Sequence, residues 1–104
     1  MRITELFDNG EFVVSAEVGP PKGIHIDGMV EEAKEYLKGV HFVNVTDNQS
    51  SVMRLGSLAT CKVLKDAGLN PIFQLTCRDR NRIALQSDLL SAAMLVIYKI
   101  FFLY

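Results

Sequence analysis

The chain has 104 residues, of which 49% are hydrophobic and 22% are charged, so it has the size and balance of one ordinary globular domain. Its 11 basic and 12 acidic residues leave a net charge of −1, which gives no electrostatic reason to expect nucleic acid or an anionic membrane as a partner. Cys61 and Cys77 form no zinc or disulfide framework, which indicates a reducing compartment, most simply the cytoplasm.

Strands and helices are predicted to alternate along the chain, after a short opening helix over 4–7. Four segments rich in β-branched and aromatic residues are expected to be strands, over 12–18, 41–46, 71–76 and 96–104. Three segments with apolar residues at helical spacing lie between them, over 26–38, 52–67 and 82–95. The order β-α-β-α-β-α-β is typical of a parallel sheet with right-handed crossovers.

This rhythm fits either a flavodoxin-like sheet or a (β/α)8 barrel. A complete barrel needs about 250 residues, so the barrel interpretation makes 1–104 a single partial domain with four of the eight strands. The last segment, 96–104, is strongly apolar and contains Lys99. With its apolar neighbours it is still shorter than the roughly 20 residues of a membrane-spanning helix, so we interpret it as a strand that risks aggregation if left uncovered.

Three of the predicted strands become polar on one face near their carboxyl ends. Alternation puts on that face the pairs Ser15 and Glu17, Asn44 and Thr46, and Gln74 and Thr76. Ligands of parallel α/β folds bind outside the carboxyl ends of the strands. Taken singly, each residue fits an exposed strand end or a turn cap better than a site. The register shared by three strands favours the floor of a polar ligand site.

The segments that follow these strands carry weaker signals. VGPPKG (18–23) lacks the spacing of a P-loop or a dinucleotide fingerprint, so a structural turn is the preferred interpretation. TDNQSS (46–51) could bind a heteroaromatic ring edge, or could be a solvated loop whose Ser50 or Ser51 caps the next helix. In CRDRNR (77–82) a structural role is favoured, with Asp79 as a helix cap.

Three blocks then carry a family resemblance, AEVGPPKG (16–23), VNVTDNQSSVMRLGS (43–57) and PIFQLTCRDRNRIALQSDLLSAA (71–93). On these blocks the sequence resembles the methylenetetrahydrofolate reductase family, most closely its short bacterial forms. The resemblance implies the N-terminal half of a (β/α)8 TIM barrel and FAD as cofactor. It also implies reduction of 5,10-methylenetetrahydrofolate to 5-methyltetrahydrofolate by hydride from the reduced flavin.

The resemblance also implies roles for individual residues. Glu17 matches the family's catalytic acid, which protonates the folate so that its five-membered ring can open. Thr46, Asp47 and Gln49 match positions that contact the flavin after the second strand, and Gln74 matches a flavin-contacting position in the third. Implied partners are methylenetetrahydrofolate and an electron donor, NAD(P)H or ferredoxin. A homo-oligomer is expected, and a separate partner subunit is allowed.

The sequence departs from the family after Ala93. Relatives continue with a Leu-Gly-Ile run and a fourth strand that ends in Gly-Asp, whereas this chain has Val96 in place of the glycine and no Gly-Asp before Tyr104. We therefore expect 96–104 to be a divergent fourth strand, in a truncated or altered chain with little or no reductase activity alone. Such a chain is expected to be oligomeric or poorly soluble.

Two other interpretations remain open. One is a non-catalytic α/β remnant or association module that binds neither flavin nor folate. The other is a folate-binding methyltransferase-type barrel, which shares the fold but needs no flavin; the TDNQ and QLTCRDRNR blocks speak against it.

Desolvation on a mostly apolar strand could make Glu17 a proton donor near neutral pH in the enzyme interpretation.

Overall fold

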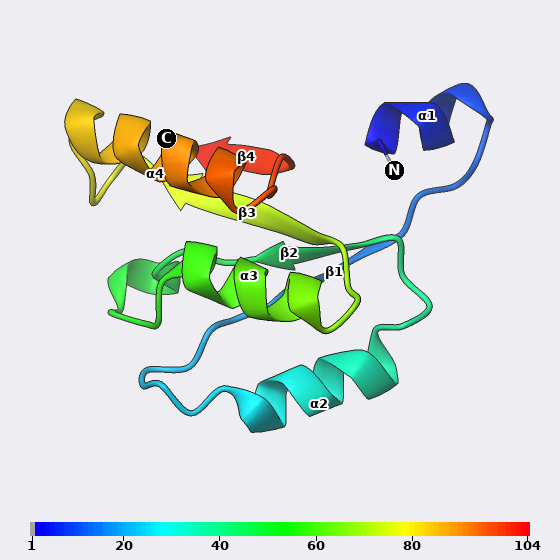
Figure 1. Cartoon of the computed structure of the whole chain (residues 1–104), viewed down its shortest axis with the longest axis horizontal. Helices are drawn as coiled ribbons and strands as arrows, with labels where there is room; N and C mark the ends of the chain where they lie inside the picture. The colour runs from blue at the N-terminus through cyan, green and yellow to red at the C-terminus, as the bar shows by residue number, and fades with distance from the viewer. Residues whose placement is uncertain (1) are drawn as a thin grey trace.

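A computed structural model describes residues 2–104 and contains one four-stranded parallel sheet with helices between the strands (Figure 1). The strands are β1 (Ser15–Val18), β2 (Phe42–Val45), β3 (Pro71–Thr76) and β4 (Ile100–Leu103). The helices are α1 (Ile3–Asp8), α2 (Asp27–Tyr36), α3 (Ser57–Asp66) and α4 (Arg82–Met94), with a 3-10 turn, η1 (Gln49–Ser51). The strands lie in chain order and every neighbouring pair is parallel. This arrangement confirms the predicted α/β class and the N-terminal half of a (β/α)8 barrel.

Several predicted boundaries were too wide. The first strand begins at Ser15 rather than at 12, and the fourth occupies only Ile100–Leu103 of the predicted 96–104. The helix predicted over 52–67 begins at Ser57 with Gly56 at its N-cap, so neither Ser50 nor Ser51 caps it. In each case the apolar pattern runs on into the flanking loops, where Ile97 is buried in the core but Phe12 is 87% exposed.

The cap of α4 also differs from the prediction. The Asn81 side chain accepts a 2.9 Å hydrogen bond from the backbone N–H of Ala84, so Asn81 and not Asp79 is the N-cap. Asparagine is as good an N-cap as aspartate. Asp79 pairs instead with the neighbouring Arg78, which satisfies its carboxylate.

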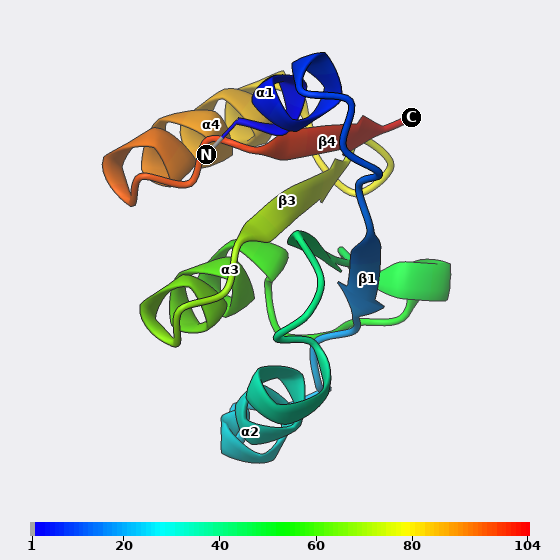
Figure 2. The ribbon, with the colours of Figure 1, turned by 90° about the vertical axis from the view of Figure 1, so that its right-hand side faces the viewer.

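The two faces of the sheet have different roles. Figure 2 shows α2, α3 and α4 along one side of the curved sheet, with α1 near β4. The outer face supplies the apolar core against these helices, with Val43, Val45, Phe73 and Leu75 almost fully buried. The inner face carries the polar residues predicted for the site. In a parallel sheet the residues of one face alternate with those of the other, so the core and the site share the same three strands.

Helices α1, α3 and α4 end in the same backbone motif. The residue after each C-cap has a positive φ: +73° at Gly10, +93° at Gly68 and +61° at Val96. In each, two backbone N–H groups return to the last-turn carbonyls, as in a Schellman motif; for α4 they are Val96 N to Ala93 O at 3.0 Å and Ile97 N to Ala92 O at 2.8 Å. Glycine adopts this conformation without strain, whereas a β-branched residue does not.

Lysine contacts partly compensate for the strained valine. Lys65 Nζ donates to the carbonyl oxygens of Val96 at 2.7 Å and of Leu95 at 3.3 Å. These bonds satisfy carbonyls that the end of α4 leaves without helical partners. Hydrogen bonds therefore stabilise the turn that leads into β4, although valine at its centre disfavours the left-handed backbone conformation.

Replacing Val96 with glycine should stabilise the chain. Relief of the left-handed strain should exceed the added flexibility of glycine in the unfolded chain, for a net gain of about 1 kcal/mol. Urea unfolding of Val96→Gly should therefore show a higher midpoint with an unchanged slope.

The matched control is Gly68→Val at the end of α3. An added Cβ at Gly68 meets no atom within 4 Å, so the backbone conformation alone would be penalised, and the midpoint should fall by a similar amount. A Val96→Gly protein that is less stable than the parent would contradict this account of the α4 terminus.

Candidate functional site

A hollow of about 350 Å³ lies at the carboxyl ends of the strands, on the inner face of the sheet. All five residues predicted for the site line it, namely Glu17, Thr46, Asp47, Gln49 and Gln74. Thr76, which the alternation also placed on this face, lines the hollow too. Further lining comes from residues that the sequence did not single out as ligand contacts, among them Arg78, Phe101 and Leu103. The site therefore draws on β1, β3 and β4 and on the loops that follow β2 and β3.

Strand register explains why these side chains meet. Glu17 is paired with Asn44, and Gln74 with Phe101, and paired residues of parallel strands project from the same face. The Asn44 side-chain amide donates to Ser15 Oγ at 3.3 Å, so the predicted inward orientation of these two residues is observed. The apolar contribution of β4 was not foreseen, because its register against β3 cannot be read from its composition.

Glu17 lies on the free edge of the sheet and its side chain is exposed. No residue in 2–104 buries it, so the desolvation that we expected for a strand acid is not present. The carboxylate nevertheless faces the hollow.

Thr46 has an unsatisfied polar atom at the floor of the hollow. The residue is only 4% exposed, and its Oγ1 has no hydrogen-bond partner within residues 2–104. A buried hydroxyl without a partner costs about 1–3 kcal/mol. A Cβ at position 19 would lie 3.7 Å from Thr46 Oγ1, an ordinary van der Waals distance, so Gly19 packs beside this atom. The hydroxyl is therefore a buried polar group without a partner, next to the loop that follows β1.

Gln49 is positioned by an unusual loop. Asn48, Ser50 and Ser51 all have positive φ, which reverses the chain tightly after β2. Asn48 Oδ1 accepts from the backbone N–H of Arg54 at 2.9 Å, and Arg54 Nη1 donates to the carbonyl oxygen of Pro20 at 3.3 Å. These bonds connect the loop after β2 to the loop after β1 on either side of the hollow.

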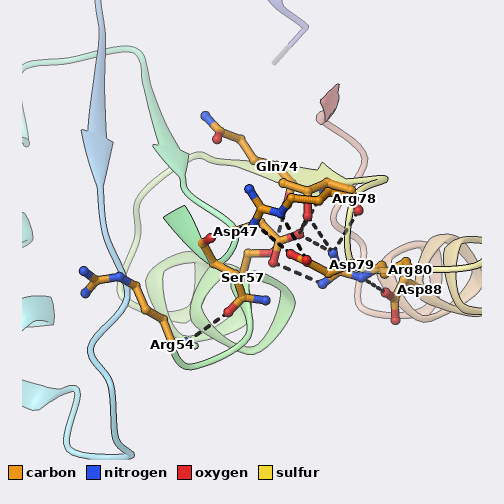
Figure 3. Close-up of polar contacts among 10 residues, drawn as sticks. Asp47, Arg54, Ser57, Gln74, Arg78, Asp79, Arg80 and Asp88 are labelled. Atoms are coloured by element: carbon orange, nitrogen blue, oxygen red, sulfur yellow. Dashed lines mark hydrogen bonds and ion pairs between the residues drawn. The ribbon is translucent and has the colours of Figure 1, made fainter. Parts of the chain in front are cut away.

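Asp47 is committed to the protein rather than to a ligand. Its side chain is fully buried, and its carboxylate accepts from Thr76 N at 2.9 Å, from Thr76 Oγ1 at 3.0 Å and from both terminal nitrogens of Arg80, with Nη2 to Oδ1 at 3.1 Å (Figure 3). Burying a carboxylate is costly unless it is paired and hydrogen-bonded in this way. The role left for Asp47 at the hollow is to fix the backbone around it.

Arg80 connects this carboxylate to the next helix. Its Nε donates to Asp88 Oδ2 at 2.9 Å, and its Nη1 donates to the carbonyl oxygen of Thr76 at 3.1 Å. The hydrogen bond with Asp47 raises the pKa of Arg80 above its usual value, with the charges of Asp47 and Asp88 acting in the same direction. One guanidinium therefore joins the ends of β2 and β3 to α4.

Sequence reasoning did not find this pair, because Asp47 and Arg80 are 33 positions apart and each follows a different strand. Only the shared edge of the sheet brings them together. Gln74 points away from this cluster in Figure 3, while its backbone carbonyl accepts from Ser57 Oγ at 2.9 Å. Its carboxamide is one of the predicted ligand contacts and remains directed at the hollow.

A second, exposed pair lies beside the first. Arg78 Nη2 donates to Asp79 Oδ2 at 2.7 Å and to the carbonyl oxygen of Asn48 at 2.9 Å. The hydrogen bond from Arg78 lowers the pKa of Asp79. Solvent screens such a pair, so it contributes little to stability. Arg78 is the one cation among the lining residues named for this hollow.

One comparison with known proteins identifies a family. The family described as methylenetetrahydrofolate reductase matches residues 2–103. No curated protein matches the chain. Within residues 2–104, no helix is both long and apolar enough to cross a bilayer, and no cluster of three or more His, Cys, Asp or Glu side chains is placed to bind a metal ion.

Removal of Arg80 should destabilise the chain strongly. In Arg80→Ala the buried Asp47 carboxylate loses its counter-charge, which typically costs about 3 kcal/mol. Chemical denaturation monitored by far-ultraviolet circular dichroism would measure the loss.

Arg78→Ala is the matched control, because it removes an arginine of the same loop from an exposed pair. Its cost should be much smaller than that of Arg80→Ala, because solvent screens the exposed pair. Equal losses in the two variants would show that the Asp47–Arg80 pair is not the main connection at this end of the sheet.

Proposed function

The chain belongs to the methylenetetrahydrofolate reductase family, and from that premise we propose that it is part of a flavin-dependent oxidoreductase that reduces 5,10-methylenetetrahydrofolate to 5-methyltetrahydrofolate. Membership suggests a folate-related oxidoreductase, and the family generally uses flavin. The observation that supports the finer proposal is the unpartnered hydroxyl of Thr46. Thr46 lines the same hollow as Glu17 and Gln74.

The residues present fit a flavin of the FAD type. Thr46 Oγ1 can donate to or accept from a ring heteroatom, and the carboxamides of Gln49 and Gln74 offer both donors and acceptors. Asp47, held by Arg80, fixes the start of the loop that carries Gln49. When bound, the reduced flavin would supply the hydride that converts the methylene group to methyl.

Glu17 is proposed as the acid of the reaction. Protonation of a folate ring nitrogen is needed before the five-membered ring can open, and a carboxylic acid at the rim can supply that proton. Glu17 is exposed in this structure and faces the hollow, so its carboxyl group could reach a folate bound there. The electron donor would be NAD(P)H or ferredoxin, which would reach the flavin from the open side.

The activity of these 104 residues alone is proposed to be low. On the β4 side the hollow is lined by Phe101 and Leu103, where the family's Gly-Asp motif would bring a carboxylate. These side chains add apolar contact but no polar group. The same observation favours the alternative of an association module that binds neither ligand, and flavin binding decides between the two.

Flavin binding should depend on the Thr46 hydroxyl. Titration of the protein with FAD, followed by quenching of flavin fluorescence, should show saturable binding. Thr46→Val keeps the shape of the residue and removes one hydrogen bond worth about 1 kcal/mol, so the dissociation constant should rise about fivefold.

Thr60→Val is the matched control. Thr60 is equally buried, but its hydroxyl bonds to the Gly56 carbonyl oxygen within α3 at 3.0 Å, away from the hollow. Its affinity for FAD should not change. No saturable binding by the parent chain would contradict the proposed function and favour the association module. Equal affinities of the parent and Thr46→Val would remove Thr46 from the flavin site.

A further inference from the structure

The hollow has charges of opposite sign on two sides of its rim, and we propose that Arg78 binds the phosphate end of the flavin cofactor that the hollow takes. The inference rests on the proposed function and adds to it the direction in which the cofactor lies. The ring would lie on the floor of the hollow, and the phosphates would leave it on the β3 side, away from Glu17.

The polar residues of the hollow divide into a buried floor and an exposed rim. Thr46 and Gln74 are only 4% and 8% exposed, so they form the floor. The Arg78 side chain, in contrast, is 44% exposed. A ring system is favoured at the floor, because its apolar surface leaves water there. A charged group is costly to bury, so a phosphate is favoured at the rim.

The size of the hollow also separates the ring from the phosphates. Its volume of about 350 Å³ is near the lower end of the range for ligand pockets. A cofactor as long as FAD would therefore extend past the rim, with its ring enclosed and its diphosphate outside. On the β4 side, Phe101 and Leu103 line the hollow and offer apolar contact to a ring rather than to an anion.

Arg78 is already held in position and has unused hydrogen-bond donors. Its Nε donates to Asp79 Oδ1 at 3.0 Å, and its Nη2 donates to Asp79 Oδ2 and to the carbonyl oxygen of Asn48. Its Nη1 makes no hydrogen bond within residues 2–104, so two N–H groups remain for a ligand. The Asp79 carboxylate weakens the attraction for an anion but does not occupy these donors. A side chain that is fixed beforehand loses less freedom on binding.

The position of Arg78 does not depend on an edge of the sheet. Strand β3 pairs with β2 on one side and with β4 on the other. The hydrogen bonds of Arg78 go to the loops that follow β2 and β3. Figure 3 shows Arg78 in the same cluster as Asp47 and Gln74, and all three line the hollow.

Glu17 lies across the hollow from Arg78. It comes from β1, whereas Arg78 follows β3, and β2 lies between these two strands. A phosphate on the β1 side would meet the Glu17 carboxylate, and like charges repel. Arg78 is the one cation among the residues of 2–104 that line the hollow, so an anion is favoured on the β3 side. The space beside Glu17 is then left to the folate that this acid is proposed to protonate.

Comparison of three flavins tests the contact. Riboflavin, FMN and FAD share one ring, but riboflavin has no phosphate. In fluorescence titrations, Arg78→Gln should bind FAD and FMN about fivefold more weakly than the parent does, as expected for one charged contact that solvent screens. Its affinity for riboflavin should not change. Arg78→Lys keeps the charge and should retain part of the preference for FAD. Added salt should weaken FAD binding by the parent more than by Arg78→Gln.

Arg82→Gln is the matched control. Arg82 belongs to the same arginine-rich segment, is exposed and does not line the hollow, so its loss changes the net charge equally without removing a contact. Its affinity for all three flavins should not change. Equal losses of FAD affinity in Arg78→Gln and Arg82→Gln would overturn the contact, because they would reflect net charge alone.

The remaining outcomes separate this inference from the proposed function. If Arg78→Gln weakens riboflavin as much as FAD, or leaves FAD binding unchanged, Arg78 does not bind the phosphates, while flavin binding by the parent still supports the proposed function. If the parent shows no saturable binding of any of the three flavins, the proposed function and this inference are both overturned.

Discussion

The salt bridge between Asp47 and Arg80 is the interaction on which the carboxyl end of the sheet depends. A fully buried carboxylate is costly by itself, and here it is satisfied by one guanidinium and by two groups of Thr76. The same guanidinium binds Asp88 of α4. Because the flavin-contacting candidates Thr46 and Gln49 flank Asp47 in sequence, the geometry of the hollow follows from this pair even though Asp47 itself has no free oxygen to offer.

The fold was largely accessible from the sequence because it depends on local pattern. Strand β3 was predicted with its observed bounds, since PIFQLT is apolar, β-branched or aromatic except at Gln74 and is bounded by turn residues. Element ends were less accessible, because loop residues such as Val52 continue the apolar pattern beyond the helix. Three-strand alternation also placed Glu17, Thr46 and Gln74 at one mouth. It could do so because alternate residues of a strand lie on opposite faces of the sheet, so the sequence itself tells which side chains share a face.

What the sequence could not provide were the interactions between loops. The Asp47–Arg80 pair and the left-handed turn at Asn48 depend on how separate loops meet at the sheet edge. The exposure of Glu17 is of the same kind, because it depends on β1 being the edge strand in the part of the chain that the structure describes. The four strands keep the strand register of a complete barrel but do not enclose an interior. Residues that would lie inside an eight-stranded barrel therefore lie at an exposed rim here.

The valine at the end of α4 has a consequence for local unfolding. Its left-handed backbone raises the energy of the turn that leads into β4, and within residues 2–104 that strand pairs with β3 alone. Such a unit opens without disturbing the rest. Amide protons of Phe73 and Cys77, which donate to the carbonyl oxygens of Lys99 and Leu103, would then exchange with deuterium through detachment of the C-terminal strand rather than through global denaturation. The chain's tail would behave as its own cooperative module.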